Sequence, residues 1–173
     1  MRILIDADGC PVVDETIELA QKFGAECHIL CDTAHVFDKS GAVCHVFPRG
    51  ADSVDFALVN FAVPGDIVIT QDYGLASMCL ARGAVVINQN GHEYTADNID
   101  ALLMQRHVAR KVRSAGGRLS GPRKRCAEND AEFIRKLTSV LERCTDYKIL
   151  YIKICKNVLI SNKICDIIYC AIF

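Results

Sequence analysis

The sequence has almost no net charge, because 20 Lys and Arg oppose 21 Asp and Glu, so no overall field points to a nucleic-acid partner. It also lacks the basic region, long apolar stretch and small-residue cleavage site of a secretory signal, since a strand-like run begins at once. Charges interrupt even the apolar final stretch, whereas a membrane span needs about twenty mainly apolar residues. From these absences we expect a cytoplasmic protein that does not engage a membrane.

Cysteine, by contrast, is abundant, with 10 residues among 173. Several lie in apolar runs, where a cysteine behaves as a small hydrophobic residue, and we interpret them as reduced thiols. The group Cys27, His28, Cys31, Cys44 and His45 contains the residue types that bind zinc. Alternation in ECHILC and AVCHVF, however, places neighbouring residues on opposite faces of a sheet, and this disfavours a zinc site.

Strand-like and helix-like segments alternate over about the first ninety residues. The predicted strands are RILID, ECHILC, AVCHVF, DIVIT and AVVIN, and the predicted helices are PVVDETIELAQKF, SVDFALVNFAV and DYGLASMCLAR. Such alternation is typical of an α/β fold, a three-layer sandwich in which helices cover both faces of a mainly parallel sheet. Two C-terminal helices are expected to follow, one from the TADN cap to about Ser114 and one over ENDAEFIRKLTSVLERC.

The chain is expected to contain one domain over residues 1–144, because a chain of this length builds a single core. A helix and a Gly-rich linker over 101–127 form its basic segment. The tail over 145–173 differs in kind: it is dense in Ile, Lys, Asn, Tyr and Cys and contains no Gly or Pro. We interpret this tail as a non-native or frameshifted extension.

Aspartates follow two of the predicted strands. RILID ends in Asp6, with Asp8 two residues on, and Asp72 stands two residues after DIVIT. If these two strands are neighbours, their carboxyl ends meet at the edge where α/β sheets bind ligands. Such a cluster suits Mg²⁺ or Mn²⁺, which bind through a few carboxylates with water and substrate phosphate. The sequence therefore predicts Asp6, Asp8 and Asp72 as metal ligands.

These acids also have simpler structural explanations. A single Asp after a strand is commonly a turn residue. Asp52 is a candidate helix cap, as is Ser53, and Asp55 in the first helical turn is favoured by the helix dipole. Asp66 precedes its strand, at the opposite edge of the sheet, and we interpret it as a turn residue. The coincidence of acids at two carboxyl ends nevertheless favours a functional site, to which Asp55 or Asp52 adds a carboxylate.

A first family resemblance lies in DADGC, which resembles the DxDGT opening of haloacid dehalogenase-like phosphatases. In those enzymes the first Asp is the nucleophile and the second is the general acid, and Thr70 resembles the second motif of that family. The chain shows no matching lysine motif and no paired acids after a later strand. The phosphatase interpretation is therefore the weaker one.

A longer resemblance covers the chain from Met1 to about Leu141. MRILIDADGCPV, PRGADSVDFALV and PGDIVITQDYGLASMCLARGAVVINQNGHEYTADNI resemble, in order and spacing, the uncharacterised bacterial YaiI/YqxD family, whose fold is similar to that of PIN-domain nucleases. The resemblance implies a PIN-like domain with a metal-dependent ribonuclease site. Carried over onto this sequence, that site consists of Asp6, Asp55 and Asp72, with Asp8 and Asp52 as further acids and Asn98 as an outer polar member.

The segment 101–127 contains eight Lys or Arg and no Asp or Glu. Arginines recur there at helical spacing, which suits contacts to phosphate groups. Basic residues near a helix C-terminus also complement the helix dipole, and a charge run is commonly a solvated face. Few aromatic residues lie nearby, so a surface that stacks bases is not supported. The candidate substrate-binding residues are Arg106, Arg110, Arg113, Arg123, Lys124 and Arg125.

Together these features predict a metal-dependent nuclease that uses Mg²⁺ or Mn²⁺ to hydrolyse phosphodiesters, with RNA favoured over DNA. The candidate catalytic residues are Asp6, Asp8, Asp55 and Asp72, with Asp52, Thr70 and Asn98 as secondary candidates. A non-catalytic RNA- or nucleotide-binding module, and the haloacid dehalogenase-like phosphatase, stay as alternatives. The oligomeric state is left open.

Overall fold

The computed structural model describes residues 1–157 except 35–36, 51, 119–120 and 122–123, with side chains described as far as residue 150. The described strands join into one sheet in the order β3-β2-β1-β4-β5-β6. Neighbouring strands are parallel except β5 and β6, which are antiparallel. The strands are β1 (Arg2–Asp6), β2 (Glu26–Asp32), β3 (Val43–Phe47), β4 (Ile67–Ile69), β5 (Val85–Ile87) and β6 (Glu93–Tyr94).

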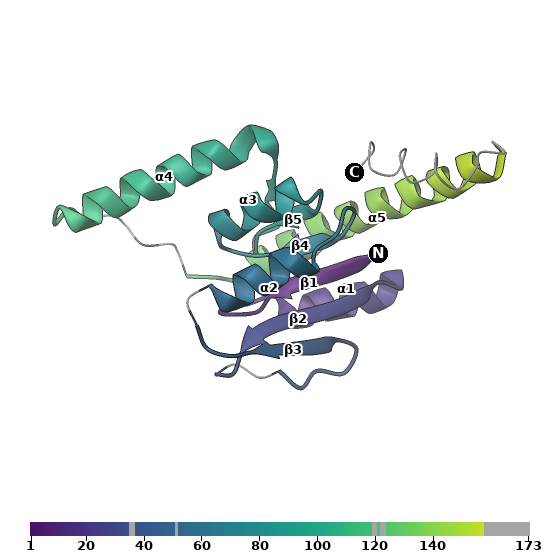
Figure 1. Cartoon of the computed structure of the whole chain (residues 1–173), viewed down its shortest axis with the longest axis horizontal. Coiled ribbons are helices and arrows are strands. Elements are labelled where there is room, and N and C mark those ends of the chain that lie inside the picture. The colour runs from purple at the N-terminus through teal and green to yellow at the C-terminus, as the bar shows by residue number, and fades with distance from the viewer. Residues whose placement is uncertain (35–36, 51, 119–120, 122–123, 158–173) are drawn as a thin grey trace.

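Helices cover both faces of this sheet (Figure 1). One face packs against α1 and α5, and the other packs against α2, α3 and the base of α4. The three-layer α/β sandwich with a mainly parallel sheet is therefore confirmed. The helices are α1 (Val13–Phe23), α2 (Ser53–Phe61), α3 (Tyr73–Ala81), α4 (Ala96–Ser114) and α5 (Ala127–Asn157).

The core lies on both sides of the central strands. A parallel sheet is buried on both faces, so its strands are nearly continuous apolar runs. Along β1, Ile3 and Ile5 enter the core beneath α1 and α5, whereas Leu4 enters the core beneath α2 and α3. All three are fully buried, as are Phe133 and Leu137, with which α5 closes the first of these two cores.

The order of the strands reverses next to β1. The chain first adds β2 and β3 on one side of β1 and then crosses over to add β4 and β5 on the other side. β1 and β4 are parallel neighbours, with Ile5 opposite Ile69, so their carboxyl ends meet at this reversal. Open α/β sheets bind ligands at such a point, because the loops diverge there and leave a crevice.

The edge strand β6 was not predicted from the sequence. The Asn-Gly signal predicted only a tight turn, and the structure continues it into a short antiparallel pairing of Val86 with Tyr94 and Ile87 with Glu93. Gly91 adopts φ 77° in this turn. A two-residue strand is too short to show the alternation on which strand prediction rests.

Helix α5 is longer than the sequence predicted. It was expected to end near Cys144, yet it continues to Asn157 and so crosses the predicted tail boundary at residue 145. The stretch contains no Gly or Pro that would end a helix there. Residues 158–173, the rest of the predicted tail, lie outside the described residues. Within the described ranges, no helix combines the length and apolar character needed to cross a membrane.

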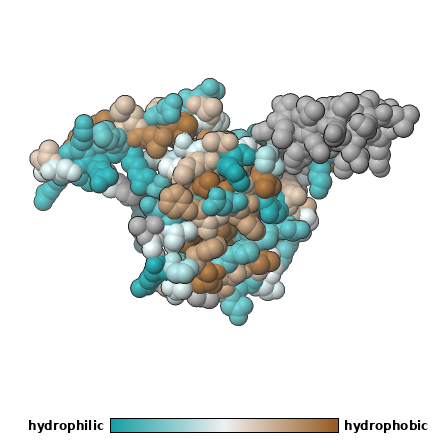
Figure 2. Space-filling view, viewed as in Figure 1, coloured by the Kyte–Doolittle hydropathy of each residue, from teal (hydrophilic) through white to brown (hydrophobic). Residues whose placement is uncertain are grey.

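Helix α4 is anchored at its base and then projects from the body (Figure 1). Thr95 begins it in a capping box, in which the Asn98 Oδ1 atom accepts a hydrogen bond of 3.0 Å from the Thr95 amide. Ile99 is its one buried residue among those described, and Leu102 and Leu103 pack against the same core. Hydrophilic residues cover much of the rest of α4, with apolar ones among them (Figure 2).

Candidate functional site

An open cavity of about 390 Å³ lies at the carboxyl ends of β1 and β4. Asp6 ends β1, Asp8 lies in the following loop, Asp72 precedes α3, and Asp55 projects from the first turn of α2. The four acids predicted as catalytic therefore line one cavity, and they do so at the point where the strand order reverses. Its lining residues are Asp6, Asp8, Gly9, Asp55, Gln71 and Asp72.

The buried Thr70 connects the two acidic loops. Its hydroxyl donates a hydrogen bond of 2.7 Å to the Asp6 Oδ2 atom and accepts one of 3.0 Å from the Asp72 amide. Beside it, the Gln71 Nε2 atom donates a hydrogen bond of 2.9 Å to the Gly9 carbonyl. Thr70 and Gln71 thus fix the loop after β1 to the loop after β4. Gln71 was not singled out from the sequence, although its place beside Asp72 at the strand end is a usable signal.

Asp72 has both carboxylate oxygens engaged. Its Oδ1 atom caps α3 by accepting hydrogen bonds from the Gly74 and Leu75 amides, at 2.6 and 3.2 Å. Its Oδ2 atom accepts a hydrogen bond of 2.8 Å from the Arg106 Nη1 atom. Burial by itself raises the pKa of Asp72, but the bonds from Arg106, Leu75 and Gly74 outweigh it and hold the pKa below its ordinary value.

Negative charge is crowded around Asp6 and Asp55. Burial raises the pKa of Asp6 to about 6; the Thr70 hydroxyl opposes this rise, and the charges of the other cavity acids add to it. The pKa of Asp55 is also raised, first by burial and then by Asp72, Asp52 and Asp8, while Arg106 acts in the opposite direction. Carboxyls in such a state gain stability from a bound cation or a proton.

The donor set of this cavity fits a hard divalent cation. Among the described residues, no three His, Cys, Asp or Glu side chains converge closely enough to hold a metal ion as they stand. Mg²⁺ and Mn²⁺ do not need such a cage, because they bind through one or two carboxylates and keep several waters. An open cavity lined by four carboxylates provides both the oxygen ligands and the room for water.

Two secondary candidates lie apart from the cavity. Asp52 is exposed, adopts φ 60° at the N-cap of α2 and makes no capping hydrogen bond with its side chain. Asp52 thus occupies the N-cap position, as predicted, and its backbone carbonyl accepts a hydrogen bond of 2.9 Å from the Phe56 amide. Ser53 is the first residue of the helix, and its hydroxyl donates to the Pro48 carbonyl at 2.8 Å. Asn98 caps α4, and its Nδ2 atom donates to the Glu93 carbonyl at 3.0 Å, so it serves the local structure of that helix.

Asp66 lies at the amino end of β4, on the opposite edge of the sheet from the cavity, as the sequence indicated. It is more than a turn residue, because its carboxylate is buried and pairs with the Arg2 guanidinium. The backbone amide of Val63 also donates to it, at 3.0 Å. Asp66 therefore joins β1 to the loop before β4 and takes no part in the cavity.

The predicted phosphate-binding residues separate into two groups. Arg106, Arg110 and Arg113 share one face of α4, and Arg106 reaches the cavity through Asp72. Arg125 instead pairs with Asp130 at 2.6 Å and with the Asn90 side chain at 3.0 Å, at the base of α5. Lys124 is exposed in the linker, and Arg123 lies outside the described residues.

The Cys and His residues of β2 and β3 lie on opposite faces of the sheet, as the alternation predicted. Cys31 is buried on the α1 and α5 face, with its Sγ atom 3.6 Å from that of Cys44. His28 packs against Phe61 of α2 on the other face, with its Nδ1 atom 3.1 Å from the His45 Nε2 atom. All described cysteines are free thiols.

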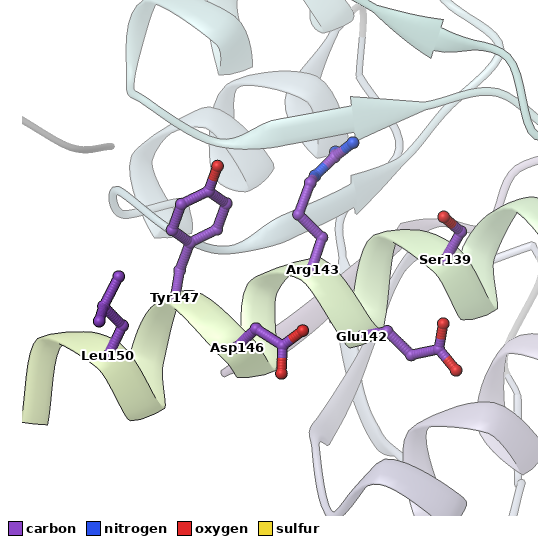
Figure 3. A pocket seen from close by; sticks show the side chains of 6 residues that line it. All are labelled: Ser139, Glu142, Arg143, Asp146, Tyr147 and Leu150. Atoms are coloured by element: carbon purple, nitrogen blue, oxygen red, sulfur yellow. The ribbon is translucent and has the colours of Figure 1, made fainter. Parts of the chain in front are cut away.

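A second cavity, of about 420 Å³, runs along α5 (Figure 3). Arg143 and Tyr147 project from one side of the helix, and Glu142 projects from the other. Arg143 and Tyr147 also line a neighbouring hollow that contains Gly83 and Val85, at the amino end of β5. This region therefore lies at the edge of the sheet opposite the acidic cavity. Its lining residues are Ser139, Glu142, Arg143, Asp146, Tyr147 and Leu150.

Comparison with known proteins shows that residues 4–143 match the model of a family described as "Uncharacterized BCR, YaiI/YqxD family". A UPF0178 protein from Exiguobacterium sibiricum is 52% identical over 146 residues, which cover 84% of this chain and 100% of the relative. A UPF0178 protein from Clostridium acetobutylicum is 46% identical, over 77% of this chain and 91% of the relative. A UPF0178 protein from Staphylococcus haemolyticus is 41% identical, over 82% of this chain and 98% of the relative. No solved structure matches this chain.

Proposed function

This chain belongs to the YaiI/YqxD family, and from its acidic cavity we propose that it is a Mg²⁺- or Mn²⁺-dependent nuclease that hydrolyses phosphodiesters in RNA. The observation that carries the proposal is the convergence of Asp6, Asp8, Asp55 and Asp72 on one open cavity at the reversal of strand order. A PIN-like relationship of the fold and a cytoplasmic location belong to the same proposal.

The acids divide into ligands and a base. Asp6, Asp8 and Asp72 are the candidate ligands: one or two of them would hold the divalent ion while water completes its coordination, and the bound ion would supply Lewis-acid activation of a water and neutralise the scissile phosphate. Asp55 lines the cavity and has a raised pKa, which suits a general base. A water oxygen attacks phosphorus as its proton passes to Asp55. The bond to the leaving oxygen then breaks, and that oxygen takes a proton from solvent.

The arginines of α4 supply contacts to the nucleic-acid backbone. Arg106 and Arg110 are exposed and lie on the same helix face, which begins at the cavity and continues away from it. Guanidinium groups bind phosphate through two parallel hydrogen bonds and recognise no base sequence. A strand that enters the cavity along α4 therefore meets a row of cations. RNA is favoured over DNA through the PIN-like resemblance.

Two other functions use the same cavity. A non-catalytic nucleotide-binding module is favoured by the Arg106–Asp72 ion pair, which already neutralises one of the acids. A haloacid dehalogenase-like phosphatase would use Asp6 as a nucleophile and form an acyl phosphate on it. That chemistry is not supported here, because no lysine is among the described residues that line the cavity.

The first experiment measures binding of Mn²⁺ by following the free ion with paramagnetic resonance. We expect saturable binding in the wild type that is weakened in Asp6→Asn and in Asp72→Asn, because each substitution removes a ligand charge. Asp100→Asn is the matched control, since this exposed carboxylate on α4 does not line the cavity. Equal binding by all four proteins would show that the cavity is not the metal site.

The second experiment measures cleavage of a short single-stranded RNA with Mn²⁺ and with EDTA. The nuclease proposal predicts cleavage that requires the ion and is lost in Asp72→Asn. A binding module predicts no cleavage, while oligonucleotide binding survives or improves in that variant because repulsion of phosphate falls. A phosphatase predicts turnover of a small phosphomonoester and a trapped adduct on Asp6.

A further inference from the structure

Arg106 is a cationic side chain that α4 places at the rim of the acidic cavity. Its Nη1 atom lies 2.8 Å from the Asp72 Oδ2 atom. The Asp72 Oδ1 atom is already occupied by the Gly74 and Leu75 amides at the start of α3. Oδ2 is therefore the Asp72 oxygen that remains for a metal ion, and in this structure it is bonded to Arg106.

We propose that Arg106 is a resident counter-cation that a divalent ion displaces from Asp72, and that the released guanidinium then binds a phosphate of the nucleic-acid strand in the cavity. The inference rests on the proposed nuclease function and concerns the regulation of the same site. Arg106 is thus a positioning residue that couples metal binding to substrate binding.

The Arg106–Asp72 ion pair is of the kind that is easily broken. The side chains of Arg106 and Asp72 are 53% and 35% exposed, so water screens their attraction. A divalent ion on the same carboxylate oxygen repels the guanidinium, and its own attraction to the carboxylate is stronger because it carries two charges. Metal binding at Asp72 therefore favours release of Arg106.

The rest of α4 holds its position when Arg106 is released. The Thr95 capping box and the buried Ile99 fix the base of the helix, and Leu102 packs against the same core. Only the long side chain of Arg106 has to swing, and it stays beside the cavity. The guanidinium exchanges one anionic partner, the carboxylate, for another, the phosphate.

Arg110 and Arg113 continue the same face of α4 beyond Arg106. At about 1.5 Å per residue, the row from Arg106 to Arg113 is roughly 10 Å long and leads outward from the cavity. Before metal binds, Asp72 holds the innermost cation of this row. After metal binds, the whole row is free for phosphates, so metal and nucleic acid are expected to bind cooperatively.

The test compares Arg106→Ala with Arg110→Ala, which removes the same charge one helical turn further out. We expect Arg106→Ala to bind Mn²⁺ about threefold to tenfold more tightly than the wild type, because the competing cation is gone. Arg110→Ala is expected to bind Mn²⁺ as the wild type does. Thermal unfolding of both variants checks that the fold is intact.

A second readout is the affinity for a short 2′-O-methyl RNA, which is not cleaved, measured with and without Mn²⁺. The wild type is expected to bind this RNA more tightly with the ion, and Arg106→Ala is expected to lose that gain. Arg110→Ala should bind more weakly under both conditions and keep the gain. Arg106→Lys, which preserves the charge, should recover part of the increase in RNA affinity that Mn²⁺ produces in the wild type.

The results separate this inference from the proposed function. If Arg106→Ala binds Mn²⁺ no more tightly than the wild type, the arginine is not a competitor, while loss of binding in Asp72→Asn still supports the metal site. If Mn²⁺ strengthens RNA binding equally in Arg106→Ala and in the wild type, the coupling is overturned. Absence of saturable Mn²⁺ binding in every protein overturns the proposed function and this inference together.

Discussion

On balance, the surroundings of Asp6 favour its protonated form over its charged form. Burial and the other cavity acids raise the pKa of Asp6 to about 6, from an ordinary value of 3.8. Because the folded pKa is the higher one, the stabilising contribution of Asp6 is complete below pH 3.8 and is lost as the pH rises through about 6. At neutral pH and without metal, Asp6 therefore destabilises the fold.

Asp6→Asn is expected to stabilise the metal-free protein at high pH. Asn keeps an oxygen that can accept the Thr70 hydrogen bond but carries no charge. A pKa rise of this size corresponds to at most about 3 kcal/mol, so we expect a gain of about 1–3 kcal/mol at pH 8 and almost none at pH 4. The measurement is the free energy of unfolding in urea with EDTA at both values of pH.

Asp100→Asn serves as the control for this prediction, because it removes an exposed carboxylate and should change stability little at either pH. A stability gain in Asp6→Asn that is the same at pH 4 and pH 8 would contradict the electrostatic explanation. Stabilisation upon removal of a charged residue is the pattern expected of a site kept for binding.

The sequence predicted which acidic side chains lie together but not that the Arg106 side chain forms an ion pair with one of them. Asp6 and Asp72 follow parallel strands that are neighbours, so strand order alone brings them together. Arg106 is 34 residues from Asp72, and its position depends on the direction in which α4 leaves the body after β6. That direction follows from packing of Ile99 and the turn before it, which no local pattern encodes.

At the scale of elements, the turn between β5 and β6 is held against α5. Gly91 has φ 77°, and a Cβ atom there would lie 2.6 Å from the Lys136 Cβ atom and 3.3 Å from the Phe133 Cα atom. Gly91→Ala is therefore expected to destabilise the protein by about 2–4 kcal/mol, through backbone strain and overpacking together. Urea unfolding of the variant measures this cost.

Gly116→Ala is the matched control for the turn. Gly116 has a similar φ of 81°, but nothing lies within 4 Å of its Cβ position. Its substitution is expected to cost only the left-handed backbone strain, about 1–2 kcal/mol. Equal costs for the two substitutions would show that the turn does not press against α5.

The strand β6 and the C-terminal end of α5 are the parts of the secondary structure that the sequence did not predict. The strands and helices up to β5 repeat a clear pattern of apolar residues, and the structure contains each of them. β6 depends on pairing with β5, and its two residues show no sequence pattern from which this pairing could be predicted. α5 passes Cys144 because nothing local ends it, and the change in composition at the predicted tail does not interrupt a helix.

At the scale of the whole molecule, charge is separated in space. The formal net charge is −1, yet residues 101–127 contain eight basic and no acidic residues, so the rest of the chain is acidic. Most of α4, which carries part of this basic segment, projects away from the body (Figure 1). Under the proposed function, a nucleic acid would therefore meet a local basic surface and not an overall attractive field.

The last prediction concerns how salt weakens RNA binding. If Arg106, Arg110 and Arg113 neutralise three phosphates of a single strand, the logarithm of the association constant should fall against the logarithm of salt concentration with a slope of about −2. The double variant Arg110→Ala/Arg113→Ala should reduce that slope to roughly −0.7, because one contact remains. Fluorescence anisotropy with a labelled RNA at constant Mn²⁺ measures both slopes.

A double variant away from α4 shows whether this effect is local. Lys22→Ala/Arg135→Ala removes the same charge from exposed positions on α1 and α5. Counterion release depends on which cations touch phosphate, so the slope of this variant should equal that of the wild type. If both double variants reduce the slope equally, net charge governs binding, and α4 is not the surface along which the strand lies.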